Sequence, residues 1–390
     1  MTNSAANSNW TTEGVARGAF IAGGAGAVLS IVGGFFDSAQ FFRSYIVAYI
    51  FWLAIPLGSL AFLMLHFLVG GGWGVMIRRL LESATRTLPL IALLFVPLLF
   101  GLQAVYPWAA PGHIAEDEIL RQKSAYLNVP FFIVRTILYL GLWGVLSYFL
   151  NRWSREQDAS AELPAGKRMR RLSGPGLLIY LFTMTFASVD WIMSIEPHWY
   201  STIYGFIWIV NQGVAAMAFA IIGLAWLGAR EPLATRLRPS HFQDLGNLLL
   251  AFIMLWAYMM FSQYLIIWSG NLAEEIPWYI ARREGLWRWL PPLLAIFHFF
   301  VPLFLLLMRD VKRKRNVLVW VAAGVLVMRL LDTYWMIVPG FENSMIHWLD
   351  ATLLVGIGGL WLGVFLWQLE KMPLLPLHVA LLAEETNTHG

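Results

Sequence analysis

The chain has 390 residues, of which 59% are hydrophobic and 13% are charged, with a formal net charge of +4 and a mean hydropathy of +0.64. This composition excludes a soluble globular protein, because a soluble domain cannot bury so much apolar surface. The chain contains no cysteine. Disulfides, iron–sulfur ligation, thiolate metal sites and covalently bound haem c are therefore excluded for this chain.

Apolar stretches long enough to cross a bilayer follow one another along the whole chain. About 20 apolar residues in a helix cross the ~30 Å hydrocarbon core. The sequence predicts an all-α membrane protein with ten spans, in which residues 1–16 and 369–390 form tails. The predicted spans are 17–36, 44–69, 87–106, 129–150, 175–194, 203–228, 244–268, 291–308, 316–338 and 349–368.

The basic residues predict the orientation of these spans. Most of the 27 lysine and arginine residues lie in the loops after the second, fourth, sixth and eighth spans or near the termini. Cytoplasmic loops carry an excess of lysine and arginine. We therefore expect a multi-pass membrane protein with both tails in the cytoplasm.

Three segments between the spans have their own character. Residues 73–86 have the pattern of a short basic amphipathic helix, which we expect to lie at the cytoplasmic membrane interface. On the opposite side, residues 107–128 and 269–290 are rich in tryptophan, proline and acidic residues. Tryptophan favours the membrane interface, so we expect these two outer loops to lie on the bilayer or against a partner. The sequence contains no zinc motif, nucleotide-binding glycine motif or nucleophile elbow.

Apart from Arg17, Asp244 and Asp350 at the span ends, only four fully charged side chains lie inside the predicted spans, namely Arg135, Asp190, Arg329 and Asp332. A charge in hydrocarbon costs at least ~2.5–3.5 kcal/mol, so such residues pair with one another or line a polar interior. Arg329 and Asp332 are three residues apart and share a helix face, which allows an ion pair. In a proton relay, Asp190 and Asp332 would be the groups that exchange protons. Arg135 and Arg329 would hold them near ionisation, because a nearby positive charge favours a carboxylate.

Polar residues of several spans lie at similar predicted depths. Counting 1.5 Å per residue from the outer end of each span gives depths of ~6–13 Å. The residues at these depths are Arg135, Asp190, Gln212, Gln263, His298, Arg329 and Asp332. Glu196 and His198 follow at the outer mouth, whereas His66 lies near the inner end of its span. We interpret the outer group as a polar pocket or half-channel that opens outward, the alternative being an ion-pair network that fixes helix packing. The different depths of His66 and His298 argue against a haem b held between them.

Four stretches resemble one family of membrane proteins. They are residues 66–90, 100–109, 128–135 and 188–205, of which the last, SVDWIMSIEPHWYSTIYG, is the most specific. Together they resemble the ActF-type membrane subunit of bacterial alternative complex III, a member of the NrfD/PsrC-like proteins. The matching stretches contain His66, Arg135, Asp190, Glu196 and His198.

The resemblance implies a fold, a function and partners. The ten helices would form two four-helix bundles with two peripheral helices, in a subunit of a quinol:cytochrome c or electron-acceptor oxidoreductase. The partners would be an ActC-like second NrfD-type subunit, a periplasmic iron–sulfur subunit, haem c subunits and small membrane anchors. The chain itself would hold no redox cofactor. The polar residues would form either a site for a quinone such as menaquinone or a proton half-channel facing the periplasm.

Two other functions stay open from the sequence. A secondary transporter would place its substrate among the same charges, although the glycine runs lie at span ends rather than at the midplane. A purely structural scaffold of the complex would use the charges only for packing. A transporter is expected to purify alone, whereas a subunit is expected to purify with haem-containing and iron–sulfur proteins.

Overall fold

The computed structural model describes residues 11–110, 112, 117–159, 164–341 and 345–376, so the predictions for residues 1–10 and 377–390 lie outside it. The described residues form helices and connecting turns without a β-strand. Ten helical segments are long and apolar enough to cross a membrane, and each predicted span overlaps one of them. The all-α fold with ten spans is therefore confirmed.

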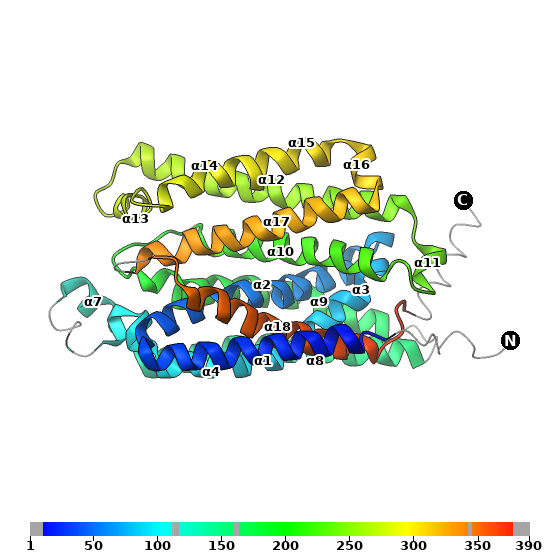
Figure 1. The fold of residues 1–390 in the computed structure, drawn as a ribbon, viewed down its shortest axis with the longest axis horizontal. Coiled ribbons are helices and arrows are strands. Elements are labelled where there is room, and N and C mark those ends of the chain that lie inside the picture. The colour runs from blue at the N-terminus through cyan, green and yellow to red at the C-terminus, as the bar shows by residue number, and fades with distance from the viewer. Residues whose placement is uncertain (1–10, 111, 113–116, 160–163, 342–344, 377–390) are drawn as a thin grey trace.

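The spans pack side by side with their axes nearly parallel (Figure 1). They are α1 (Glu13–Phe36), α2 (Ser38–Val69), α3 (Gly72–Thr85) continued by α4 (Leu88–Phe100), α8 (Val129–Ala159), α9 (Pro164–Trp191), α10 (Tyr204–Leu227), α12 (Pro239–Gly270), the segment 287–307, α17 (Arg315–Ile337) and α18 (Trp348–Glu370). The segment 287–307 consists of η3 (Trp287–Trp289), α14 (Leu290–Leu294), the π-helix η4 (Ala295–Phe300) and α15 (Val301–Leu307).

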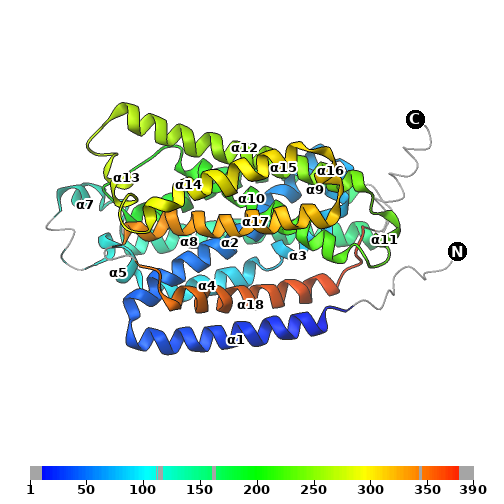
Figure 2. The same cartoon turned by 45° about the horizontal axis from the view of Figure 1, so that its top comes forward.

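Short helices mark the two ends of the bundle. One end carries α5 (Leu102–Val105), η1 (Pro107–Ala109), α7 (Glu118–Lys123), η2 (Met193–Ile195), α13 (Pro277–Ala281) and η5 (Val338–Gly340). The other end carries α11 (Leu233–Arg236) and α16 (Arg309–Arg313). Figures 1 and 2 show α7 and α13 together at one end and α11 and α16 at the other. We call the α7/α13 end the outer end and the α11/α16 end the inner end, following the predicted orientation.

The centre of the molecule is the contact between α2 and α10. These two helices are the most deeply buried of the ten spans. At their crossing, a Cβ atom on Gly58 would lie 2.2 Å from the backbone oxygen of Gln212, so only glycine allows the backbones to approach this closely. α2 also packs against α3 and α9, and α10 packs against α12 and α17. The α2–α10 contact thus joins a first group of helices, which contains α2, α3 and α9, to a second group, which contains α10, α12 and α17.

The first and last spans form a peripheral pair, in which α1 packs along α18 (Figure 2). The contact is lined by small residues: a Cβ atom on Gly26 would lie 2.7 Å from the backbone nitrogen of Gly356. The remaining face of α1 is apolar and exposed, as expected for a lipid-facing helix. At the inner end the Glu370 carboxylate accepts a hydrogen bond of 2.7 Å from the hydroxyl of Thr12.

This packing predicts the effect of one substitution. Gly26→Val is expected to push α1 away from α18 and to lower the free energy of unfolding by about 1–3 kcal/mol, as overpacking does. The measurement is the midpoint of heat denaturation of the detergent-solubilised chain. Gly24→Val is the control, because a Cβ atom on Gly24 has no neighbour within 4 Å. An equal effect of both substitutions would contradict the proposed close contact.

The segment 73–86 does not form an exposed helix on the surface of the bundle. The segment forms α3 as predicted, but the residues from Ile77 to Thr85 are buried, including Arg78, Arg79 and Glu82. α3 packs against α2, α10 and α18 and leads directly into α4. Its charged residues are directed into the protein, where they meet the polar residues of α8 described below.

Candidate functional site

The first charged pair of the outer half joins α8 to α9. Arg135 donates from Nε and Nη2 to the two carboxylate oxygens of Asp190, at 2.8 and 3.0 Å. The hydroxyl of Tyr139 donates to the same carboxylate at 2.8 Å, and Arg135 Nη1 donates to the backbone oxygen of Tyr126 at 3.0 Å. Asp190 is completely buried and the Arg135 side chain is 8% exposed. This two-bond geometry is the strongest form of an arginine–carboxylate contact.

The second charged pair lies within α17. Arg329 donates to Asp332, as their spacing of three residues predicts, and both side chains are buried. The indole nitrogen of Trp256 on α12 donates to the same carboxylate at 3.2 Å. His298, in the π-helix η4, contacts the Trp256 ring edge-to-face with a centroid distance of 4.3 Å. Single π-turns inside α-helices are frequent at functional sites.

This second group contains buried polar atoms that lack a hydrogen-bond partner among the described residues. They are Nδ1 and Nε2 of His298, Nε of Arg329 and Oδ1 of Asp332. Buried polar groups are nearly always satisfied by protein or by internal water. Three buried side chains with free polar atoms make this the place where we expect internal water within the described part of the bundle.

The two charged pairs do not form one continuous cluster. Among the described residues, no hydrogen bond or ion pair connects Arg135 and Asp190 to Arg329 and Asp332. The charged residues with similar predicted depths therefore belong to two separate groups. One group lies between α8 and α9, and the other lies between α12, η4 and α17. Depth along a span does not define on which side of the helix a residue points.

Among the described residues, the other polar residues predicted from the sequence form no hydrogen bond with these pairs. The Gln212 side chain accepts a hydrogen bond from Tyr180, and the Gln263 side chain accepts one of 3.1 Å from Ser201. His66 is buried near the inner end, with its ring 5.8 Å from that of Trp73.

The exposed His198 lies at the outer surface, 2.6 Å from Asp117. Asp117 precedes α7 and its carboxylate accepts hydrogen bonds from the backbone N–H groups of Ile119 and Leu120. The Leu120 hydrogen bond and then that of His198 lower the pKa of Asp117. No group of three His, Asp or Glu side chains in the described residues is arranged to hold a metal ion.

Glu196 has a partner that the sequence did not indicate. Its carboxylate accepts a hydrogen bond of 2.7 Å from Arg282, which lies just after α13 in an outer loop. Arg282 is 1% exposed, stacks 3.5 Å from the centroid of the Trp278 ring and donates to the backbone oxygens of Trp278, Trp335 and Met336. The outer loop is thus fixed to α17 and η2 by one buried guanidinium.

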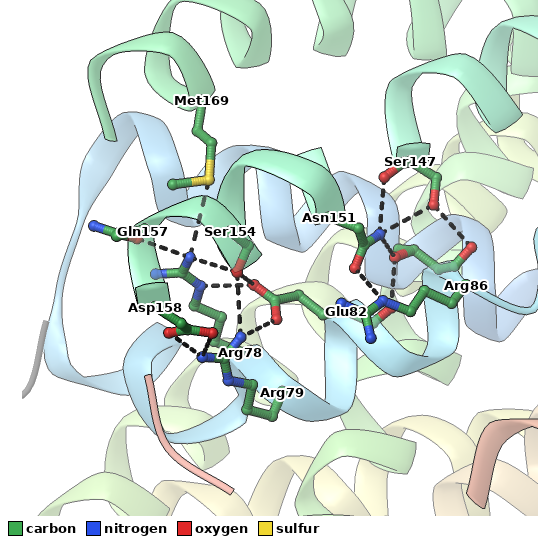
Figure 3. A network of polar contacts seen from close by, with 11 residues as sticks. Arg78, Arg79, Glu82, Arg86, Ser147, Asn151, Ser154, Gln157, Asp158 and Met169 are labelled. Carbon is green, nitrogen blue, oxygen red and sulfur yellow. Dashed lines mark hydrogen bonds and ion pairs between the residues drawn. The ribbon is translucent and has the colours of Figure 1, made fainter. Parts of the chain in front are cut away.

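The largest charged network lies at the inner end, between α3 and α8 (Figure 3). Glu82 accepts hydrogen bonds from Arg78 at 2.8 Å, from Arg79 at 2.6 Å and from Ser154 at 2.5 Å. Arg79 also binds Asp158 at 2.5 Å. Three of the four charged side chains in these contacts are at most 2% exposed.

The same interface continues toward the middle of the bundle. Arg86 donates to Asn151 at 2.9 Å, and Asn151 donates to the hydroxyl of Thr85 at 2.9 Å (Figure 3). Along α8 the polar residues Ser147, Asn151, Ser154 and Asp158 recur every three or four residues and so share one helix face. That spacing was the available signal for this network.

The fold and these buried charges define a polytopic all-helical membrane protein with ten candidate spans. The chain matches no known family model and no curated protein.

Proposed function

We propose that this chain is a non-redox integral membrane subunit of a quinol-oxidising complex of the alternative complex III type, in the bacterial cytoplasmic membrane. Its partners would be the ActC-like, iron–sulfur, haem c and small anchor subunits. The likeness of residues 66–90 and 188–205 to the ActF-type subunit supports this assignment, and so does the absence of cysteine. Quinol would be oxidised in the ActC-like partner, beside its iron–sulfur protein.

We assign proton transfer toward the outer face to this chain, and the observation that carries the proposal is the Arg135–Asp190–Tyr139 group. A buried carboxylate held by arginine and tyrosine from another helix is an exchangeable proton site close to the outer end. The hydrogen bond from Arg135 to the Tyr126 backbone connects that site to the segment that precedes α8 at the outer surface. A proton released by Asp190 would leave toward this outer surface, while Arg135 stays protonated and holds the carboxylate in place.

The test is Asp190→Asn in the complete complex reconstituted into vesicles. If Asp190 transfers protons during turnover, quinol oxidation and proton release outside are expected to fall by about 10²-fold, in the range of a lost acid–base group. The two quantities are measured together with a quinol assay and an external pH indicator. Unchanged rates in the assembled complex would exclude the proposed role.

Asp350→Asn is the matched control. Asp350 is also a buried carboxylate at the outer end, but it accepts a 2.8 Å hydrogen bond from the backbone of His347 at the start of α18 and belongs to neither charged pair. We expect this variant to retain its rates.

The second candidate is a structural scaffold. It is favoured by the closed geometry of the Arg135–Asp190 pair, in which both carboxylate oxygens already accept hydrogen bonds. Under this reading Asp190→Asn lowers the yield of assembled complex, whereas the assembled fraction keeps its full rate. Purification distinguishes both candidates from a transporter. A proton-transferring subunit and a structural subunit are each expected to purify with haem-containing and iron–sulfur partners, whereas a transporter is expected to purify alone.

A further inference from the structure

A large apolar cavity lies along the surface of the second helix group, the one that contains α10, α12 and α17. It has a volume of about 1030 Å³ and lies between α12 on one side and α14, η4 and α13 on the other. In Figures 1 and 2 the α12 and α14–α15 helices run next to each other at the edge of the bundle. The wall of the cavity on the α12 side includes Met254, Tyr258 and Phe261, whose side chains are 46%, 67% and 63% exposed. The cavity therefore opens toward the lipid.

The length of the cavity corresponds to one leaflet of a bilayer. Its α12 residues extend from Met254 to Tyr264, which is ~15 Å along a helix. Half of the hydrocarbon core is also ~15 Å thick. Tyr264 lies toward the outer end of α12, so the cavity begins near the outer interface and ends near the midplane. An acyl chain of an outer-leaflet lipid extends over the same distance, from the headgroup level to the midplane.

The outer mouth of the cavity is positively charged. Three arginines line it, namely Arg282, Arg283 and Arg288. Glu196 neutralises Arg282, but Arg283 and Arg288 are exposed and have no carboxylate within ion-pair distance among the described residues. The acidic residues of the same loop, Glu274, Glu275 and Glu284, do not line the cavity. Two unneutralised guanidinium groups at the headgroup level select an anionic ligand, and arginine is well suited to phosphate.

We propose that this cavity binds one anionic phospholipid of the outer leaflet. Its phosphate would contact Arg283 and Arg288, and its acyl chains would lie between α12 and η4. A quinone head is neutral and leaves the two arginines without a counter-charge. The lipid would cover Trp256, which lines the cavity and donates to Asp332 behind it, and so would seal the Arg329–Asp332 group from the bilayer. This inference is independent of the proton-transfer proposal.

The experiment is native mass spectrometry of the full chain, purified with its natural partners and stripped of lipid in detergent. It is titrated with dioleoyl phosphatidylglycerol and, separately, with dioleoyl phosphatidylcholine. We expect one phosphatidylglycerol per chain, bound at least tenfold more tightly than phosphatidylcholine. The double variant Arg283→Gln/Arg288→Gln is expected to lose this preference. Millimolar inorganic phosphate is not expected to replace the lipid, because the acyl chains contribute to binding.

Matched variants test the headgroup and the acyl chains separately. Arg121→Gln/Lys123→Gln removes the same charge from α7, outside the cavity, and is expected to bind phosphatidylglycerol normally. Ala257→Phe fills the cavity and is expected to weaken binding at least tenfold, whereas Ala251→Phe places the same ring on an exposed part of α12 outside it.

Three results would overturn the proposal. The first is equal affinity for the two lipids, and the second is unchanged phosphatidylglycerol binding by the Arg283/Arg288 double variant. The third is one menaquinone per chain that is lost in Ala257→Phe and retained in that double variant. Asp190→Asn lies outside the cavity and is expected to bind the lipid normally, so this proposal and the proton-transfer proposal can fail separately.

Discussion

Replacing Glu82 by glutamine is expected to destabilise the protein by about 3–5 kcal/mol, the cost of removing one partner from a buried ion pair. Glu82 is completely buried and neutralises both Arg78 and Arg79 between α3 and α8. With an uncharged side chain at position 82, only Asp158 would remain to balance the two arginines. The measurement is the midpoint of heat denaturation in detergent, followed by tryptophan fluorescence.

Glu156→Gln is the control for this prediction. Glu156 lies on α8 near the same end, but it is 41% exposed and pairs with the exposed Arg152 and Arg168. Exposed ion pairs contribute about 0–1 kcal/mol, so this variant is expected to denature close to the wild type. If Glu82→Gln is as stable as Glu156→Gln, the buried arginines do not depend on Glu82 for their neutralisation.

The network around Glu82 shows where a reading of the sequence by depth fails. The ten spans were predicted because bilayer thickness sets the length of an apolar helix. Residues 73–86 are too polar to be recognised as part of a span, so their charges were assigned to the membrane surface. The structure instead places α3 inside the bundle, because Ser154 and Asp158 on one face of α8 bind its arginines. Ser147 on the same face donates to the backbone oxygen of Thr85 at the end of α3. The charged residues of α3 and the polar face of α8 can be interpreted correctly only when the two helices are known to pack against each other.

The candidate site was predictable in depth but not in lateral position. Arg135, Asp190, Arg329 and Asp332 all lie in the half of their helices nearer the end that carries α7 and α13, since residue number along a span gives position along the helix axis. Their division into two groups depends on which helices are neighbours. Hydropathy contains no information on that, because a lipid-facing and a protein-facing side of a span are both apolar.

The outer loops show a similar limit. Their tryptophans were expected at the membrane interface, and Trp289 is 61% exposed. Trp108, Trp278 and Trp287 are buried instead. Trp278 stacks on Trp199 at 4.9 Å and supports Arg282, so the loop forms part of the protein core. A preference for interfaces does not distinguish a lipid surface from the inside of a folded loop.

Replacing Arg282 by methionine is expected to have the largest effect at the outer end. Arg282 donates to Glu196 and to three backbone oxygens. Methionine has nearly the same length but cannot donate a hydrogen bond. Each buried acceptor left without a donor costs about 1–3 kcal/mol, so a loss of several kcal/mol is expected for the three together. The readouts are the midpoint of heat denaturation and the rate at which trypsin cleaves residues 271–290.

Arg283→Met separates the structural role of Arg282 from a general loss of positive charge. Arg283 follows directly in the sequence, lines the same cavity and is exposed, with no ion pair among the described residues. It is expected to leave the denaturation midpoint and the cleavage rate unchanged while weakening phosphatidylglycerol binding. If Arg283→Met destabilises the chain as much as Arg282→Met does, the loop is held by its net charge. If only Arg282→Met does so, the loop is held by directed hydrogen bonds, because these depend on one side chain reaching Trp335 and Met336 on α17.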